Sequence, residues 1–204
     1  MPSRLQEGVA PVVALDIGGV CLSLRHDEVA RELGHESFRD LLRNHPESLA
    51  DALAHEMGRI DTDLFVERMA QRLQLARDEF LRWWNSMLGT EISGMAELVR
   101  DLRTAGFRPA FFSNVGNLHF PALLPMLSFS NLVERGILSY EIGVMKPEPE
   151  AYEAFETQIC GGGTPALYLD DREENIEGAR SRGWNTHLFH DADDAGKRIA
   201  ALQT

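Results

Sequence analysis

The stretch PVVALDIGGVCLSL (residues 11–24) begins with apolar residues, places its only carboxylate at Asp16 and continues with Gly18-Gly19. A continuous apolar run without polar alternation is typical of a strand that is buried on both faces of a parallel sheet. Ligands of open α/β sheets bind beyond the carboxyl ends of such strands. The stretch therefore predicts a buried strand that presents Asp16 to a binding site.

Three further short runs repeat this pattern later in the chain: PAFFSN (109–114), PALYLD (165–170) and NTHLFH (185–190). Helical periodicity lies around and between them, in the segments 94–106, 147–159 and 171–183. Glycine residues end two of these segments, as is common at the end of a helix. Alternation of strand and helix predicts an α/β fold with a doubly wound parallel sheet.

Residues 25–90 interrupt this alternation, because they show helical periodicity and no strand pattern. We therefore expect a core formed by residues 1–24 and 91–204 and a helical insertion formed by residues 25–90. The paired aromatic residues Trp83 and Trp84 are predicted to pack between the helices of the insertion. A role in substrate contact is the less favoured interpretation of the pair.

The composition limits the partners and the location of the protein. The chain of 204 residues has 32 acidic and 20 basic side chains, so its surface should repel nucleic acid and anionic lipid, and neither is an expected partner. Cys21 and Cys160 form no disulfide framework and no zinc-ligand spacing. With no recognisable signal peptide or membrane span, a cytoplasmic location is expected. The oligomeric state is not predicted.

Polar side chains follow the predicted strands or lie in the loops beyond them: Asp16, Ser113, Asn114, Lys146, Asp170 and Asp171. Carboxylates gathered at one sheet edge repel one another unless a cation or protons neutralise them, and oxygen ligands favour Mg²⁺. Lys146 and the Ser113 hydroxyl suit a phosphate. Each residue alone could be a helix cap or a surface group, but their convergence favours phosphoryl transfer to Asp16 as the nucleophile.

The chain resembles the haloacid dehalogenase-like superfamily across almost its whole length. The segments LDIGGV, FFSN, GVMKPEPEAY and LYLDDREENIEGA are similar to its four motifs in order and spacing. SNVGNLH, GVMKPE, DDREENIEGAR and HEMGRIDTDLFVERM (55–69) look like small bacterial sugar-phosphate phosphatases of the α-glucose-1-phosphate phosphatase type. The resemblance implies a Rossmann-like core with a helical cap after the first motif. It also implies a Mg²⁺-dependent phosphomonoesterase for a small soluble phosphate, with a sugar phosphate as the best single guess.

The resemblance also implies roles for the residues at the strand ends. Asp16 matches the nucleophile, which is also a metal ligand, and Gly18 matches a residue whose backbone carbonyl binds Mg²⁺. Asp171 matches a direct metal ligand, and Asp170 matches a ligand that binds directly or through water.

Four other residues match the part of the family's site that handles the phosphoryl group: Ser113, Asn114, Lys146 and Asn175. Ser113 and Asn114 match the motif that holds the phosphoryl group. Lys146 matches the lysine that neutralises the charge of nucleophile and phosphate. Asn175 matches a polar helper in the fourth motif.

The chain departs from the family pattern at Gly18. Most phosphatases of this superfamily carry an Asp there, which is the general acid for the leaving group and the general base for water. His26 and His119 could replace it, although a histidine satisfied on a helix or on the surface is the favoured interpretation of each. Without a proton donor, turnover should fall steeply as the leaving alcohol becomes more basic, and a hexose 1-phosphate should be preferred over the 6-phosphate.

Two alternatives to a phosphatase remain open at this point. A dehalogenase also uses an aspartate nucleophile, but displacement at carbon needs no divalent cation and gains nothing from Asp170-Asp171. A catalytically impaired protein that keeps the fold for binding or regulation is the other alternative, and Gly18 is the reason to consider it.

Overall fold

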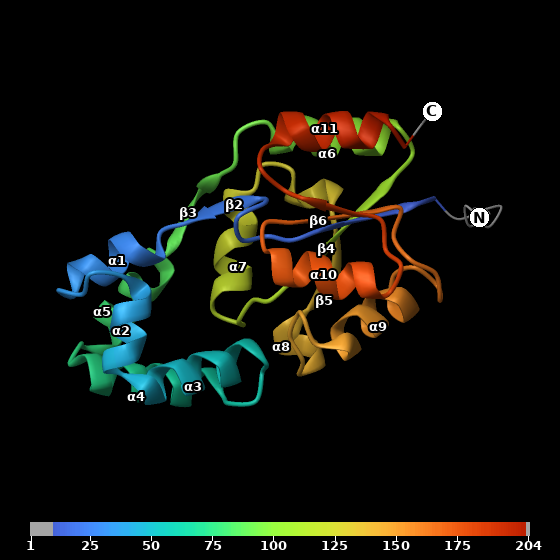
Figure 1. Ribbon diagram of the computed structural model, residues 1–204. Helices are drawn as coiled ribbons and strands as arrows, with labels where there is room; N and C mark the ends of the chain where they lie inside the picture. Colours follow the sequence, from blue (N-terminus) through green and yellow to red (C-terminus); the bar gives the residue numbers. More distant parts are fainter. Residues whose placement is uncertain (1–9, 203–204) are drawn as a thin grey trace.

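The first predicted strand lies at the centre of a five-stranded parallel sheet in the computed structural model, which describes residues 10–202 (Figure 1). The strand order is β5-β4-β1-β6-β7, and every pairing in this sheet is parallel. The strands are β1 (Val12–Leu15), β4 (Arg108–Ser113), β5 (Glu134–Leu138), β6 (Leu167–Asp170) and β7 (Thr186–Leu188). The α/β class with a doubly wound, Rossmann-like sheet is confirmed.

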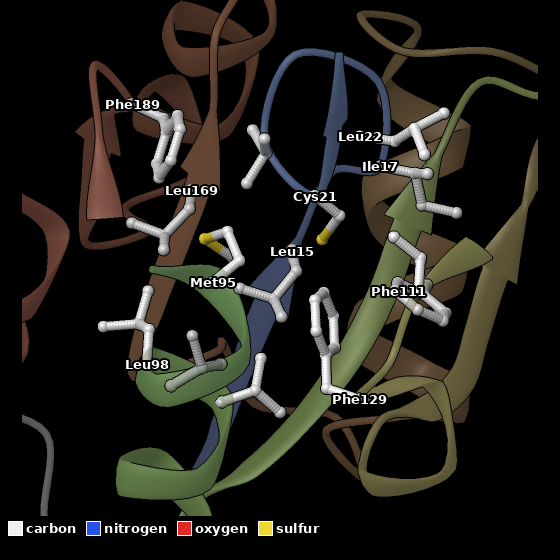
Figure 2. Packing of buried hydrophobic residues seen from close by; sticks show 14 of the residues in the cluster. Leu15, Ile17, Cys21, Leu22, Met95, Leu98, Phe111, Phe129, Leu169 and Phe189 are labelled. Atoms are coloured by element: carbon white, nitrogen blue, oxygen red, sulfur yellow. The ribbon is translucent and has the colours of Figure 1, made fainter. Parts of the chain in front are cut away.

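Helices cover both faces of this sheet, which is why β1 is buried along its whole length. Val13 and Leu15 belong to a hydrophobic cluster that includes residues of α6 (Met95–Thr104) and α11 (Ala192–Ala200). Figure 2 shows this side, with Leu15 of β1 beside Met95 and Leu98 of α6. Val12 and Ala14 belong to a second cluster, together with residues of α9 (Pro149–Gln158) and α10 (Glu173–Ser181). Successive residues of β1 thus pack alternately against the helices on the two faces of the sheet.

Two sets of strands were not expected from the sequence. Strand β5 lies at the sheet edge, and its ERGIL sequence carries charged residues at half-buried and exposed positions. Strands β2 (Leu22–Leu24) and β3 (Leu88–Glu91) form an antiparallel ribbon. Because β3 begins within residues 25–90, the expectation of no strand there was wrong. These strands are short, and β2 pairs with residues more than sixty positions away, so no local pattern marks them.

Five helices lie between β2 and β3, on one side of the sheet (Figure 1): α1 (His26–Glu32), α2 (Phe38–Asn44), α3 (Pro46–Glu56), α4 (Thr62–Leu73) and α5 (Arg77–Asn85). We call this part the helical segment. It has a hydrophobic cluster of its own, in which Phe65, Phe80, Trp83 and Trp84 are buried. The Trp83 indole also donates a hydrogen bond to the Val29 carbonyl at 3.0 Å. The packing interpretation of the two tryptophans is confirmed, and the division into a core and a cap stays a prediction.

Short helical elements complete the chain between β4 and α9: α7 (His119–Leu123), α8 (Ser139–Ile142) and two 3₁₀ turns, Leu124–Met126 and Ser130–Leu132. The end of α3 rests on α8, and we call this the α3–α8 contact. Gly58 has φ +62°, and a Cβ there would lie 2.2 Å from the Tyr140 carbonyl oxygen. The Arg59 guanidinium donates to the Gly143 carbonyl at 3.0 Å. Only glycine allows such a close approach of two backbones.

No helix within residues 10–202 is both long and apolar enough to cross a membrane.

Candidate active site

The carboxyl ends of β1, β4 and β6 bring the predicted polar residues to one place, together with the loop after α8. All of them except Asp170 line one pocket of about 180 Å³: Asp16, Gly18, Ser113, Asn114, Lys146 and Asp171. Asp170 is fully buried and does not line that pocket. The sequence-based expectation that these side chains converge agrees with their placement.

Lys146 lies at the centre of this group. Its Nζ is 3.0 Å from Asp16 Oδ1 and 2.6 Å from Asp170 Oδ2, and it donates to the Phe112 carbonyl at 2.7 Å. Burial disfavours the charged amine, but attraction to Asp16 and Asp170 outweighs it and raises the pKa of Lys146. Lys146 therefore remains a cation between two carboxylates.

Asp170 has the most completely bonded carboxylate of the group. It accepts hydrogen bonds from Lys146 Nζ, the Tyr168 hydroxyl, the Arg172 backbone N–H at 2.9 Å and Asn175 Nδ2 at 3.0 Å. Burial favours the neutral acid, yet attraction to Lys146 and these hydrogen bonds lower the pKa of Asp170 overall. Its contacts make Asp170 a residue that positions Lys146, and Asn175 in turn supports Asp170.

Asp16 and Asp171 offer freer oxygens. Burial raises the pKa of Asp16 to about 6, although Lys146 and the Ser113 hydroxyl act in the opposite direction. Burial and repulsion by Asp170 raise the pKa of Asp171. Gly19 has φ +77°, and a Cβ there would lie 2.1 Å from Asp171 Oδ2, so both the backbone conformation and the approach of Asp171 favour glycine in the turn after Asp16.

The donor set fits a divalent cation. Asp16, Asp170 and Asp171 each offer an oxygen, and these three oxygens lie within 4.8 Å of one another. Three carboxylates against the single ammonium of Lys146 leave an excess of two negative charges. Oxygen ligands of this kind suit a hard ion such as Mg²⁺.

Asn114 makes a contact that the family resemblance does not imply. Its Nδ2 donates to the Lys146 carbonyl at 2.8 Å, and its Oδ1 accepts from the Lys146 N–H at 2.8 Å. The side-chain amide of Asn114 thus pairs with both the N–H and the carbonyl of Lys146, and this pairing holds the loop that carries Lys146 in place. Holding a phosphoryl group stays a prediction for Asn114.

The two histidines considered as proton donors both line the pocket. His119 Nε2 lies 3.0 Å from the Trp84 carbonyl, and its ring stacks on the Trp84 indole with centroids 5.0 Å apart. Burial lowers the pKa of His119 to about 4, and burial also lowers the pKa of His26. Both rings are therefore neutral at neutral pH, which does not favour either as the acid that Gly18 lacks.

Sequence reasoning missed one functional candidate, Glu56 at the end of α3, which lines the pocket from the helical segment. Burial raises the pKa of Glu56 to about 7, and Arg172 moderates the shift. In the sequence it is one of many glutamates on helical patterns, and no local signal distinguishes it. Its place depends on the α3–α8 contact.

Replacing Lys146 by Met should destabilise the protein strongly, because it leaves Asp16 and Asp170 buried without a counter-charge. Loss of one partner of a buried ion pair costs about 3–5 kcal/mol. The measurement is urea unfolding of the metal-free protein at neutral pH, with the exposed Lys197→Met as the matched control. Equal stability of the two variants would show that Lys146 does not neutralise these carboxylates.

Comparisons with known proteins bear on the fold of this chain. No family model matches the chain. A curated protein of Mycobacterium tuberculosis (strain CDC 1551 / Oshkosh), named Phosphatase MT3486, is 28% identical over 128 residues. The match covers 61% of this chain and 59% of that protein, so it spans less than two thirds of the relative's length.

Solved structures match over more of the chain. A HAD family enzyme of Bacteroides thetaiotaomicron has a TM-score of 0.80 and 21% identity, and the match covers 93% of this chain and 98% of that one. The same enzyme, solved with magnesium and inorganic phosphate, has a TM-score of 0.74 and 21% identity over 90% of this chain and 96% of that one. A protein of Porphyromonas gingivalis, described as a predicted HAD-like family hydrolase, has a TM-score of 0.74 and 18% identity, and the match covers 95% of this chain and 97% of that one. This chain therefore has the fold of the haloacid dehalogenase-like enzymes, as its four sequence motifs indicate.

Proposed function

We propose that the protein is a Mg²⁺-dependent phosphomonoesterase that hydrolyses a small soluble phosphate through an aspartyl-phosphate at Asp16. The observation that carries this proposal is the 3.0 Å contact of Lys146 Nζ with Asp16 Oδ1 at the pocket, beside Asp171. A carboxylate nucleophile next to a fixed ammonium is suited to attack on an anionic phosphate, because the ammonium offsets the repulsion between the two anions.

The polar residues at the strand ends and Lys146 have the following parts in the proposed reaction. The Asp16 carboxylate attacks phosphorus in line with the leaving alcohol, and water later hydrolyses the phospho-aspartate. Lys146 and the Ser113 hydroxyl bind the phosphoryl oxygens. Asp16, Asp171 and the Gly18 carbonyl would hold Mg²⁺, with Asp170 beside them, and the ion would supply positive charge next to the phosphoryl group. Asp170 and Asn114 keep Lys146 in place.

The relatives support the reaction class. The partial match in Mycobacterium tuberculosis is named a phosphatase, and the Bacteroides thetaiotaomicron enzyme was solved with magnesium and inorganic phosphate. The charge of the pocket supports the same class over a dehalogenase, because carbon–halogen displacement would gain nothing from two further carboxylates near its nucleophile. A sugar phosphate is the finer proposal for the substrate, and it rests on the motif resemblance.

The helical segment is proposed to be a cap that closes over the pocket. It leaves the core at β2 and returns at β3, next to the carboxyl end of β1, and its residues Glu56 and His26 line the pocket. Closure would bury the substrate and exclude water.

A panel of phosphates tests the reaction class. Sugar phosphates, nucleotides and p-nitrophenyl phosphate are incubated with the protein, with and without Mg²⁺, and 2-chloropropionate is included with halide detection. We expect phosphate release that requires Mg²⁺ and stops on chelation, and no halide release. Halide release would favour the dehalogenase, whereas binding of phosphate esters without turnover would favour the impaired binding protein.

A further inference from the structure

Glu56 brings a carboxyl group from the helical segment to the pocket that also contains Asp16, Gly18 and Ser113. Within residues 10–202, no side chain or backbone group donates a hydrogen bond to this carboxyl. Gly18, which follows the nucleophile by two positions, has no side chain that could move a proton. Glu56 is therefore an acidic group at the pocket that is free to meet a bound molecule.

Contacts through α8 fix the backbone of Glu56 relative to the phosphate-binding end of β4. The Ser139 hydroxyl lies 2.6 Å from the Glu56 carbonyl, to which it donates, and it accepts from the Val115 N–H at 2.9 Å. Val115 follows Ser113-Asn114 directly. The same hydroxyl thus joins the end of α3 to the loop after β4.

Glycine residues lie where the end of α3 approaches the loop after β4 and α8. A Cβ at Gly116 would lie 2.7 Å from His55 Nδ1 and 3.8 Å from Glu56 Cγ. Gly58, two residues after the end of α3, makes the α3–α8 contact. A larger residue at Gly116 would have to move the His55 side chain, and one at Gly58 would meet the Tyr140 backbone, so the close approach of the end of α3 to the pocket favours glycine at both positions.

The charged and titratable groups around Glu56 come from both parts of the fold. The residues that line the pocket from the core are Arg172, Asp171, Asp16, Lys146 and His119. His26 lines it from the helical segment. His55 and Arg59 lie close to Glu56 in the sequence. Burial dominates over the nearby guanidinium of Arg172 and raises the pKa of Glu56 to about 7. A group with this pKa is half protonated at neutral pH, which suits both giving and taking a proton.

The other titratable side chains that line the pocket within residues 10–202 are less suited to this task. Lys146 has a raised pKa and holds its proton between two carboxylates. His26 and His119 have lowered pKa values and are neutral. Asp16 is the proposed nucleophile, and Asp171 is proposed to bind the metal ion.

We propose that Glu56 is the general acid and general base of the reaction, supplied to the pocket by the helical segment. This inference rests on the proposed phosphatase function. In the first step an Asp16 oxygen forms a bond to phosphorus, the bond from phosphorus to the ester oxygen breaks, and the Glu56 proton moves to that oxygen to give the alcohol. In the second step the Glu56 carboxylate takes a proton from water as the water oxygen bonds to phosphorus. The bond from phosphorus to the Asp16 oxygen breaks, phosphate leaves, and the Asp16 carboxylate is restored. Glu56 keeps the proton from water and is ready for the next turnover.

This proposal changes one expectation drawn from the sequence. If Gly18 left the site without a proton donor, turnover should fall steeply as the leaving alcohol becomes more basic. With Glu56 as donor, the dependence is shallow in the unmodified protein and becomes steep only when Glu56 loses its proton-transfer ability.

The test compares Glu56→Gln with the unmodified protein and with Glu47→Gln, a control at the opposite, exposed end of the same helix. Alcohol release is followed in single turnovers at saturating Mg²⁺, for a series of substituted phenyl phosphates and an alkyl phosphate. We expect Glu56→Gln to lose about 100-fold or more on the alkyl phosphate and little on p-nitrophenyl phosphate. Glu47→Gln should match the unmodified protein. The decline of the single-turnover rate above about pH 7 should also disappear in Glu56→Gln.

Unfolding measurements give a readout that does not depend on activity. A carboxyl whose pKa is raised on folding stabilises the folded state fully below its unfolded pKa and loses that contribution as pH rises through its folded pKa. The unfolding free energy of the unmodified protein, relative to Glu56→Gln, should therefore fall between about pH 4.5 and pH 7. If Glu56→Gln does not fold, Glu56→Asp replaces it, and a steeper leaving-group slope is again expected.

The outcomes separate this inference from the function on which it rests. If the unmodified protein releases phosphate from none of the substrates, the proposed function fails. If it is active but Glu56→Gln keeps the same slope and the same pH profile, or loses rate equally on all substrates, only the assignment of Glu56 is overturned.

Discussion

Replacement of Asp16 by Asn is expected to abolish phosphate release while the fold is kept. The amide has nearly the same shape but cannot attack phosphorus, and loss of a nucleophile costs on the order of 10⁴-fold or more in rate. Asp16 is 6% exposed and its pKa is raised mainly by burial, so a neutral side chain suits this position better than a charged one, and Lys146 keeps Asp170 as its counter-charge. Circular dichroism and urea unfolding should resemble those of the unmodified protein.

The experiment needs two controls. Slow deamidation of the new Asn would restore Asp16, so the variant is checked by mass spectrometry before and after the assay. Asp193→Asn, at an exposed position in α11, changes the charge of the protein by the same amount and should leave turnover unchanged. Retention of more than a few per cent of activity by undeamidated Asp16→Asn would mean that another group attacks the phosphate.

Replacement of Asp171 by Ala should remove Mg²⁺ binding and activity together, with little effect on stability. Asp171 is the exposed member of the carboxylate group, so its loss leaves no buried partner unpaired. Loss of a direct ligand is expected to weaken Mg²⁺ by at least about 100-fold, since even supporting residues of metal sites cost 10–100-fold. Titration calorimetry with Mg²⁺ gives the affinity, and unfolding in the absence of the ion gives the stability.

Asp170→Asn is the informative comparison, because the two neighbouring aspartates have different surroundings. Asp170 is fully buried and bonded to Lys146, Tyr168, Arg172 and Asn175. Its replacement should lower the unfolding free energy by several kcal/mol, since a buried pair loses one charge. If instead Asp170→Asn is as stable as the unmodified protein and Asp171→Ala still binds Mg²⁺ tightly, the division of roles between them is wrong.

The parts of the structure that the sequence predicts are those set by local burial. Strand β1 was recognisable because both of its faces are covered, which leaves an apolar run with no polar interruption. Asp16, Ser113 and Asp170 could be grouped because parallel strands end at one edge of the sheet. Strand β5 could not be recognised, since an edge strand tolerates the charges of Glu134 and Arg135.

Features that depend on packing between residues far apart in the chain could not be predicted from the sequence. Glu56 is brought to the pocket by contacts such as the one with Ser139, which is 83 residues away along the chain. The difference between Asp170 and Asp171 follows from the alternation of side chains at a strand end, which predicts that they differ. It does not predict which donors surround each of them.

The β2–β3 ribbon connects both ends of the helical segment to the sheet, and this has a consequence for motion. Arg25 donates a backbone hydrogen bond to Met87 at 2.8 Å, and the Thr90 N–H donates to the Ser23 hydroxyl at 2.9 Å. Two connecting strands that are hydrogen-bonded to each other resist twisting but can bend together. We therefore expect the helical segment to rotate about a single hinge axis at the ribbon. The end of α3 lies away from the ribbon in Figure 1 and would move in such a swing. Opening of the helical segment would admit substrate and move Glu56 away from the pocket at the same time. Proton transfer by Glu56 would then take place only in the closed conformation.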